Sequence, residues 1–447
     1  MTGIQDGIDR TVNYISRSIT LKIIAIGILI LLLLIPAAMI QNLIRERQYR
    51  RDSVITEINQ KWGGSQTITG PFITVPFKDF YKDRNGETQF NLKYLHILPE
   101  TLAITGEIVP EIRYRSIFET VVYEAKLNFS GSFNIPQSGL LNVEPNYILW
   151  DKASLSVGIT DMRGIEDKIE IKFNEALYST NPGLRTADIA PSGVSTPIDL
   201  SISSDTKRFS FKMNLKGSER IDFIPVGETN TVNIKSTWPS PSFDGAFLPD
   251  KPEIKKEGFK AAWKVLHLNR NYPQFWEGKQ YEVWSSAFGV KLILTADIYQ
   301  KSTRLAKYAV MFLFFTFASF FFSEVINKQK IHPIQYILIG IAILIFYTLV
   351  LSLSEHMGFN LAYILSAVSV TLIISGYAKA IVEIKRFALM IMGVLAVLYG
   401  YLFIVLQLEE YSLLMGSIGL LVIIATVMFL TRKINWYRIE AVREKNS

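Results

Sequence analysis

The sequence predicts an α-helical membrane protein with one N-terminal span, a large mainly-β domain outside the cytoplasm, and a C-terminal five-span bundle. Two observations support this prediction. Charged residues make up 19% of the 447-residue chain, yet six stretches of about 20 residues contain almost none. A helix of about that length crosses the roughly 30 Å hydrocarbon core of a bilayer. Between the first two stretches, short segments instead alternate apolar and polar residues, as half-buried β-strands do.

The N-terminal part predicts a cytoplasmic segment, 1–22, followed by a transmembrane anchor, 23–44. The anchor is uncharged, and its apolar run is longer than the roughly 7–15 residues of a signal-peptide core. No small-x-small cleavage pattern follows it, so we expect it to stay uncleaved. Residues 45–58 continue as a helix out of the membrane, which we expect to end by Gly63-Gly64.

Residues 45–304 form the predicted outer domain. Four segments of it carry the period-2 or β-branched pattern of strands, namely 72–77, 92–98, 125–133 and 209–215. Asn85-Gly86 lies between two alternating runs and predicts a hairpin turn. Strands that recur about every ten residues, without helices between them, favour a sandwich or a stacked β architecture.

One segment of the outer domain differs in composition, because residues 236–249 contain three prolines and three aromatic residues. This composition predicts a rigid, extended loop that presents large apolar groups. Two interpretations stay open, a loop packed over the β core or a surface for a partner or ligand. The residues that would form this partner surface are Trp238, Pro239, Pro241, Phe243 and Phe247.

The C-terminal bundle covers residues 305–431 and contains five apolar segments separated by only a few residues. A soluble protein has no core that could bury five such helices in succession, so we assign them to the membrane. The segments are Leu305–Ile326, Ile334–Ser354, Phe359–Ala378, Phe387–Gln407 and Ser412–Thr431, and a basic cytoplasmic tail, 432–447, follows them.

Basic residues in the short loops predict the orientation of the bundle. The connections after its first and third segments and the C-terminal tail carry ten Lys or Arg residues together, whereas residues 355–358 and 408–411 carry none. Both termini are therefore expected in the cytoplasm and the β domain on the other side. Four arginines between residues 45 and 51 argue locally for the opposite orientation, but long domains translocate largely regardless of charge.

No catalytic or metal-binding pattern is present, so we expect neither an enzyme nor a cofactor. The chain has no cysteine and four histidines, and it lacks the HExxH, GxSxG, Walker A and GxGxxG patterns. His96 lies in a strand-like run and is expected to be structural. The net charge of +7 is largely explained by the basic residues that set membrane topology, so no nucleic-acid partner is expected.

Ionisable residues at the edges of spans are candidates for function, because charge is costly in hydrocarbon. Glu355 and His356 follow one span and Glu409 and Glu410 follow another, and together they form a candidate polar site at the membrane edge. A solvated turn is the competing interpretation. Glu324 lies near the end of the second span and is expected to extend towards water.

Several short sequence motifs, which occur in order along most of the chain, resemble those of a known family. They include Gly-Pro-Phe-Ile (70–73), Asp-Met-Arg-Gly-Ile (161–165), Trp-Pro-Ser-Pro-Ser-Phe-Asp-Gly-Ala-Phe-Leu-Pro (238–249), His-Pro-Ile-Gln-Tyr (332–336) and Leu-Ser-Glu-His-Met-Gly-Phe (353–359). The chain resembles the CreD family of inner-membrane proteins of Gram-negative bacteria. The resemblance implies a periplasmic β domain and a role in cell-envelope integrity and stress response, with effects on colicin tolerance and β-lactam response. It supplies no catalytic residues.

The sequence leaves two functional hypotheses open. The first is a non-enzymatic protein that anchors in the lipid bilayer of the cell inner membrane and binds an envelope or inner-membrane protein partner through its periplasmic domain. The second is a transporter or a lipid-handling protein in which the bundle forms a path. The aromatic segment motivates the first hypothesis, and the polar residues at the membrane edge motivate the second.

Overall fold

The computed structural model describes residues 19–136, 143–200, 206–294, 298–327, 331–382, 384–408 and 412–432. The chain forms two compact units. The β domain comprises Asp52–Thr295, and the membrane unit comprises Met1–Arg51 together with Ala296–Ser447. The sequence placed 45–304 in the outer domain, whereas in the structure helical residues at both ends of that range belong to the membrane unit.

One long helix, α2, contributes residues to both units. It runs without a break from Ile19 to Trp62, as predicted for the anchor and for its helical continuation through residues 45–58. The helix ends at the predicted place. Gly63, the next residue, has a φ of +147°, which residues with a side chain rarely adopt.

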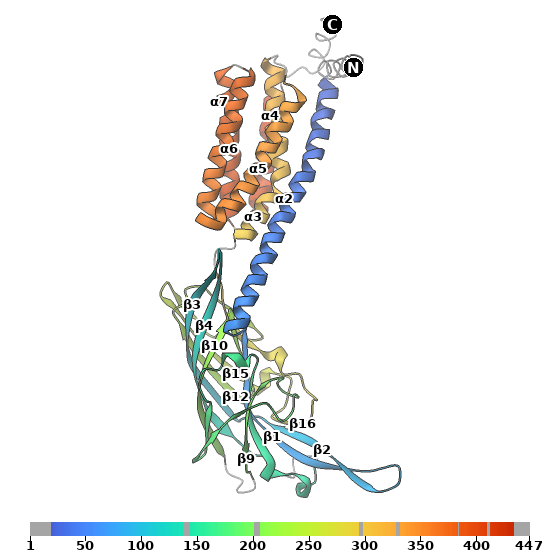
Figure 1. Cartoon of the computed structure of the whole chain (residues 1–447), viewed down its shortest axis with the longest axis vertical. Helices are drawn as coiled ribbons and strands as arrows, with labels where there is room; N and C mark the ends of the chain where they lie inside the picture. The colour runs from blue at the N-terminus through green and yellow to red at the C-terminus, as the bar shows by residue number, and fades with distance from the viewer. Residues whose placement is uncertain are drawn as a thin grey trace. The chain divides into compact units, whose positions relative to one another are not determined.

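The β domain consists of two sheets (Figure 1). The nine-stranded sheet contains β1 (Gln66–Lys82), β2 (Thr88–Ile97), β5 (Ala153–Ile159), β8 (Asn181–Pro182), β9 (Gly193–Ile198), β11 (Arg220–Ile224), β13 (Pro241–Gly245), β16 (Phe275–Glu277) and β17 (Phe288–Leu292). The eight-stranded sheet contains β3 (Thr101–Arg115), β4 (Phe118–Phe133), β6 (Glu170–Phe173), β7 (Ala176–Ser179), β10 (Lys207–Ser218), β12 (Thr229–Ser236), β14 (Glu253–Lys255) and β15 (Gly258–Leu266). Short 3-10 helices connect some strands: η2 (Pro145–Tyr147), η3 (Trp150–Lys152), η4 (Met162–Gly164), η5 (His267–Asn269) and η6 (Trp284–Ser286).

Strand order shows how the sheets are wound. The larger sheet runs β13-β17-β11-β1-β5-β9-β8, and β2 pairs with β1 and β16 beside this path. The smaller sheet runs β14-β15-β12-β3-β4-β10-β6-β7. Most pairs are antiparallel, but β1 runs parallel to β11 and β12 runs parallel to β3. Parallel neighbours need long crossover connections, so segments far apart in the sequence meet in both sheets.

The core lies between the two sheets and takes apolar side chains from both. Trp263 of β15 contacts Phe243 of β13 and Phe288 of β17, with ring centroids 5.7 and 5.6 Å apart. Because β15 belongs to one sheet and β13 and β17 to the other, these contacts cross the layer between them. The arrangement is a β-sandwich, as the alternating pattern predicted.

The predicted strands are all present: 72–77, 125–133 and 209–215 lie inside β1, β4 and β10, and 92–98 lies in β2 except for its last residue. Phe209, Phe211, Met213 and Leu215 share the buried face of β10, and the polar residues between them face outwards. The Asn85-Gly86 turn also closes the β1–β2 hairpin, where Gly86 has a φ of +82°.

The membrane unit contains helices that coincide with the predicted segments. They are α3 (Ile298–Lys307), α4 (Ala309–Asn327), α5 (Pro333–Met357), α6 (Phe359–Val382), α7 (Lys385–Gln407) and α8 (Ser412–Thr431). Helix α4 covers most of the predicted segment Leu305–Ile326, whereas α3 lies mainly before it, in the range that the sequence placed in the outer domain, and a bend of 43° separates the two helices. By length and composition, the described part of the chain has four helices able to cross a membrane, or five if this bent pair forms one span.

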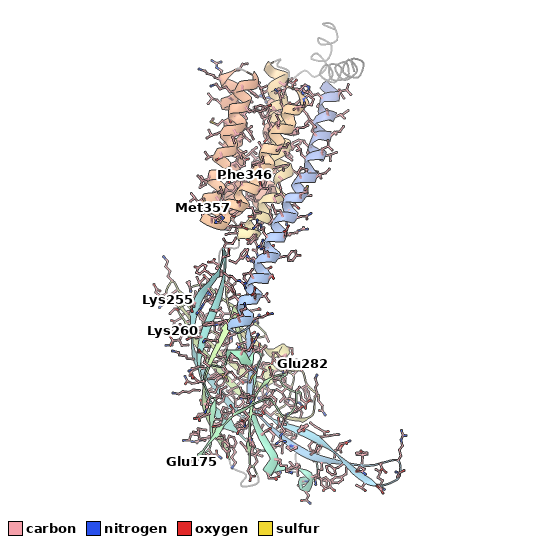
Figure 2. All side chains as sticks on the ribbon, viewed as in Figure 1. Glu175, Lys255, Lys260, Glu282, Phe346 and Met357 are labelled. Atoms are coloured by element: carbon pink, nitrogen blue, oxygen red, sulfur yellow. The ribbon has the colours of Figure 1, made fainter. Side chains whose placement is uncertain are left out.

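Packing in the membrane unit is aromatic at its centre. Phe346 of α5, labelled in Figure 2, contacts Tyr363 of α6 and Tyr399 of α7, with ring centroids 5.4 and 4.6 Å apart. At the edge, Leu33 of α2 lies against Gly340 of α5, where any side chain would collide with it. Small residues of this kind allow close approach between helices in membranes.

A capping box begins α5. The ring Nδ1 of His332 accepts the Ile334 N–H at 3.3 Å, and the Gln335 side-chain oxygen accepts the His332 N–H at 2.9 Å. Pro333 occupies the first turn, where its missing N–H leaves no helical hydrogen bond unmade. The motif His-Pro-Ile-Gln therefore marks the start of this helix.

Candidate functional site

The aromatic-proline segment packs onto the β core. Its centre is strand β13, which pairs with β17, so the segment is only partly the loop that we expected. Phe243 contacts Phe259 as well as Trp263, and the ring of Phe247 lies 5.8 Å from that of Phe288.

The other residues of the predicted partner surface occupy the flanks of β13. The Trp238 indole N–H donates to the Ile293 carbonyl at 3.2 Å, and its ring packs against the core. Pro241 opens β13 and is half-buried, whereas Pro239 is exposed. The aromatic side chains thus pack mainly against the core, and only part of each ring is exposed at the surface. A partner role for this segment stays a prediction.

An exposed apolar cluster lies instead on the hairpin of β1 and β2, which projects from the sheet (Figure 1), and on the adjoining helix η2. We call Phe80, Phe90, Leu92 and Tyr147 the hairpin surface. Their exposed fractions are 41%, 48%, 53% and 38%. The Phe80 ring centroid lies 5.7 Å from that of Phe90 and 4.7 Å from that of Tyr147, so the cluster is contiguous.

Local sequence determines the turn of this hairpin and the face that its two phenylalanines share. Phe80 and Phe90 are cross-strand partners and therefore share one face. The Asp83 carboxylate accepts the N–H groups of Asn85 and Glu87, both at 2.9 Å, which fixes the turn. The alternation of Phe80, Phe90 and Leu92 with polar residues was visible in the sequence. It predicted strands, and it did not show that both faces would be exposed.

At the membrane edge, the structure separates Glu355 from His356. The Glu355 side chain is 9% exposed, accepts a hydrogen bond from the Tyr299 hydroxyl at 2.9 Å, and lies 3.8 Å from the Arg47 guanidinium. Arg51 lies over the Tyr299 ring, 5.3 Å from its centroid. His356, the next residue along the helix, is exposed. Glu409 and Glu410 lie outside the described residues.

A more deeply buried ion pair lies at the opposite end of α5. Glu324 is 2% exposed and pairs with Lys22 of α2, so the expectation that it extends towards water is wrong. The counter-charge that compensates this burial comes from the other end of the sequence. Lys22 and Arg47 lie about 37 Å apart along α2, at ~1.5 Å per residue. The two ion pairs therefore bracket a length slightly greater than the roughly 30 Å hydrocarbon core.

His96 lies at the centre of a polar line inside the β domain. Its Nδ1 is 3.2 Å from the Thr74 hydroxyl, and its Nε2 is 3.0 Å from the Asp188 carboxylate. Burial lowers the pKa of His96, although Asp188 opposes the shift. Hydroxyl, imidazole and carboxylate in this order resemble a nucleophilic triad. Thr74 and His96 are only 1% and 0% exposed, so no substrate reaches the hydroxyl, and a structural role is the better interpretation.

Comparisons with known proteins match the sequence along nearly its whole length. The family model described as inner membrane protein CreD matches residues 18–437. The inner membrane protein CreD of Escherichia coli (strain K12) is 30% identical to this chain over 427 residues, which cover 94% of each protein. The matched region begins just before α2 and ends beyond α8, so it includes both the β domain and the membrane unit. This chain therefore belongs to the CreD family of inner membrane proteins.

Proposed function

We propose that this protein is a non-enzymatic envelope-integrity and stress-response protein whose β domain docks an envelope protein through the hairpin surface. In this proposal both termini are cytoplasmic and the β domain is periplasmic. The ten-to-none distribution of Lys and Arg among the short connections supports that orientation.

The hairpin surface is the observation that carries the proposal. Contiguous exposed apolar side chains on a folded domain commonly mark an interaction site. Aromatic side chains also provide most of the energy at many protein interfaces when a partner buries them. Charge lies beside this cluster, as in the polar rim of an interface: the Lys78 ammonium lies 5.1 Å from the Phe90 ring centroid, and Lys82 is exposed two residues after Phe80.

Strand β2 adds a second means of docking. From Thr88 to Lys93 it has β1 on one side, and the described residues place no strand on its other side. An extended segment of a partner can pair with such an edge through main-chain hydrogen bonds. Phe90 and Leu92 of the same strand would then supply the side-chain contacts.

Site-specific photocrosslinking in cells tests the proposal. A photoreactive phenylalanine analogue at position 80 or 90 is expected to capture an envelope protein. The same analogue at Leu177, which is 64% exposed on the other sheet, is the control. Crosslinks from positions 238 and 243 but not from 80 and 90 would place the partner on the aromatic-proline segment. No crosslink from any of the four positions under β-lactam or colicin stress would reject docking through the β domain.

A phenotype measurement complements the crosslinks. The double variant Phe80→Ser/Phe90→Ser is expected to lose envelope protection under β-lactam or colicin stress while its amount in the membrane stays normal. Leu177→Ser provides a control at a comparably exposed position. Full protection by the double variant would count against the hairpin surface.

A transporter or lipid-handling function is the second candidate, and the polar interior of the membrane unit favours it. The Glu355 side chain is only 9% exposed and contacts Tyr299 and the half-exposed Arg47, and among the described residues the hydroxyls of Tyr347 and Tyr399 have no hydrogen-bond partner. Buried polar groups in a membrane often mark a substrate path. If Glu355→Gln and His356→Ala both leave the envelope phenotype unchanged, this candidate loses its support.

A further inference from the structure

The outward face of the eight-stranded sheet is hollowed by an open groove of about 580 Å³. Strands β3, β4, β12 and β15 form its floor, and the chain leading into β14 forms one wall. We call it the lysine groove because Lys126, Lys235, Lys251 and Lys260 line it. Figure 2 shows Lys260 on this side of the sheet, away from the core.

Strand register explains the composition of the groove. Asn233 of β12 lies between Thr105 of β3 and Ala262 of β15, and Thr105 faces Asn128 of β4. The other residues of this row are polar but uncharged. The small side chain of Ala262 leaves space above the sheet at its own position. Side chains of every second residue share a face of a strand. The next row of side chains on this face is therefore two residues further along the strands, about 7 Å away.

The next row is charged. It runs Glu253, Lys260, Lys235, Glu107, Lys126 across five neighbouring strands. Lys235 pairs with Glu107 at 3.0 Å, which cancels one positive charge. Lys126, Lys251 and Lys260 make no ion pair with any described residue, and Glu253 is the remaining carboxylate in the lining. The groove therefore keeps a net positive charge beside an uncharged, hydrogen-bonding floor.

We propose that the lysine groove binds an acidic oligosaccharide that carries carboxylate groups. Lysine ammonium groups attract carboxylates as point charges without demanding one geometry. Asn128, Asn233 and Thr105 can each donate and accept hydrogen bonds, as sugar hydroxyls do. The ligand lies across the strands, with its acidic groups along the lysine row and its hydroxyls on the uncharged row.

Other polyanions fit this groove less well. Single-stranded nucleic acids bind by stacking bases on aromatic side chains, and none of the described residues that line the groove is aromatic. Acidic peptide motifs are usually recognised by clusters of arginine, whereas the cations among the described residues that line this groove are all lysines. The site is separate from the hairpin surface, which belongs to the other sheet, so each proposal can fail alone.

Fluorescence polarisation with the full-length protein in detergent tests the proposal. The probe is a labelled hexagalacturonate, with uncharged maltohexaose and a single-stranded oligothymidine as competitors. We expect hexagalacturonate to bind, maltohexaose not to compete, and rising salt to weaken binding because it screens the lysines. The double variant Lys126→Gln/Lys260→Gln is expected to bind at least tenfold more weakly.

Lys172→Gln is the matched control. Lys172 is exposed on the same outward face, in β6, and does not line the groove. We expect its affinity to stay within twofold of the unmodified protein, and all variants to keep the same unfolding temperature. Absence of binding, equal competition by maltohexaose or oligothymidine, or equal weakening by Lys172→Gln would each overturn the proposal.

Discussion

Lys22 and Glu324 form an ion pair inside the membrane unit although 302 residues separate them in the sequence. Their side chains are 7% and 2% exposed. Lys22 also donates to the Ile331 carbonyl at 3.2 Å, and the Tyr336 hydroxyl donates to the Glu324 carboxylate at 3.4 Å. Each charge is thus satisfied by several partners, and the pair joins α2 to the rest of the membrane unit.

Removing one member of this pair should destabilise the protein strongly. Glu324→Leu leaves the Lys22 ammonium buried without a counter-charge, which costs about 3–5 kcal/mol in comparable sites. Lys22→Met/Glu324→Leu removes both charges and is expected to recover most of that loss. Chemical unfolding in detergent micelles measures the free energy of unfolding of the unmodified protein and of the two variants.

An exposed pair on the same helix provides the control for this experiment. Lys61 and Glu57 lie one turn apart with side chains 72% and 42% exposed, so Lys61→Met should cost less than about 1 kcal/mol. Equal losses of unfolding free energy for Glu324→Leu and Lys61→Met would contradict a stabilising role of the buried pair. No recovery of stability in the double variant would contradict it as well.

The stability of the β domain should fall in mild acid because of His96. Burial holds the pKa of folded His96 below its usual value of about 6.5. Below that pH the unfolded chain takes up a proton that the folded chain does not, so the free energy of unfolding decreases as pH drops. The slope contributed by this one group can reach ~1.4 kcal/mol per pH unit.

Unfolding of the full-length protein between pH 7.5 and 5 checks this expectation. His96→Gln keeps hydrogen-bonding capacity towards Thr74 and Asp188 but cannot titrate, so its stability should depend less on pH in this range. The same pH dependence in both proteins would show that another group is responsible.

Arg270 should be irreplaceable even by lysine. Its guanidinium donates to the carbonyls of Val226 and Gly227, at 3.2 and 3.4 Å, and stacks over the Tyr272 ring at 4.1 Å. Burial lowers the pKa of Arg270 to about 10, so the group stays charged at neutral pH. A lysine cannot reproduce the planar fork of donors or the stacking.

We expect Arg270→Lys to lower the free energy of unfolding by about 2–3 kcal/mol, the range for lost hydrogen bonds to a buried charged group. Thermal unfolding of the purified protein measures it. Arg208→Lys, at an exposed position of β10, should stay within ~0.5 kcal/mol. A loss at Arg270 no larger than at Arg208 would refute the role of the guanidinium.

Membrane orientation gives the most direct prediction. Reporter fusions at about residue 150 and at the C terminus should report opposite sides of the membrane, because the basic connections and tail favour the cytoplasm. Alkaline phosphatase is expected to be active at the first position and a fluorescent protein at the second. The same side for both would invalidate the proposed topology.

Local patterns in the sequence were enough to locate the helices and many of the strands. The length of an uncharged run determines whether a helix can span a bilayer, so α2 and α4 to α8 follow from composition. Alternation determines which residues of a strand share a face, so Phe209, Phe211, Met213 and Leu215 could be assigned to one face from their spacing alone. Glycine at positions 63 and 86 marked the end of α2 and the hairpin turn for an equally local reason, its freedom to adopt positive φ.

What the sequence could not decide was which of two similar apolar groups faces solvent. Phe243 and Phe80 both have polar neighbours in the sequence. Phe243 contacts Trp263 across the sandwich, whereas Phe80 lies exposed on a hairpin that extends past the second sheet. The ion pair of Lys22 with Glu324 and the charged row across five strands depend likewise on contacts between distant segments. Periodicity is a local property of the chain, whereas burial and charge pairing depend on the neighbours that the tertiary fold supplies.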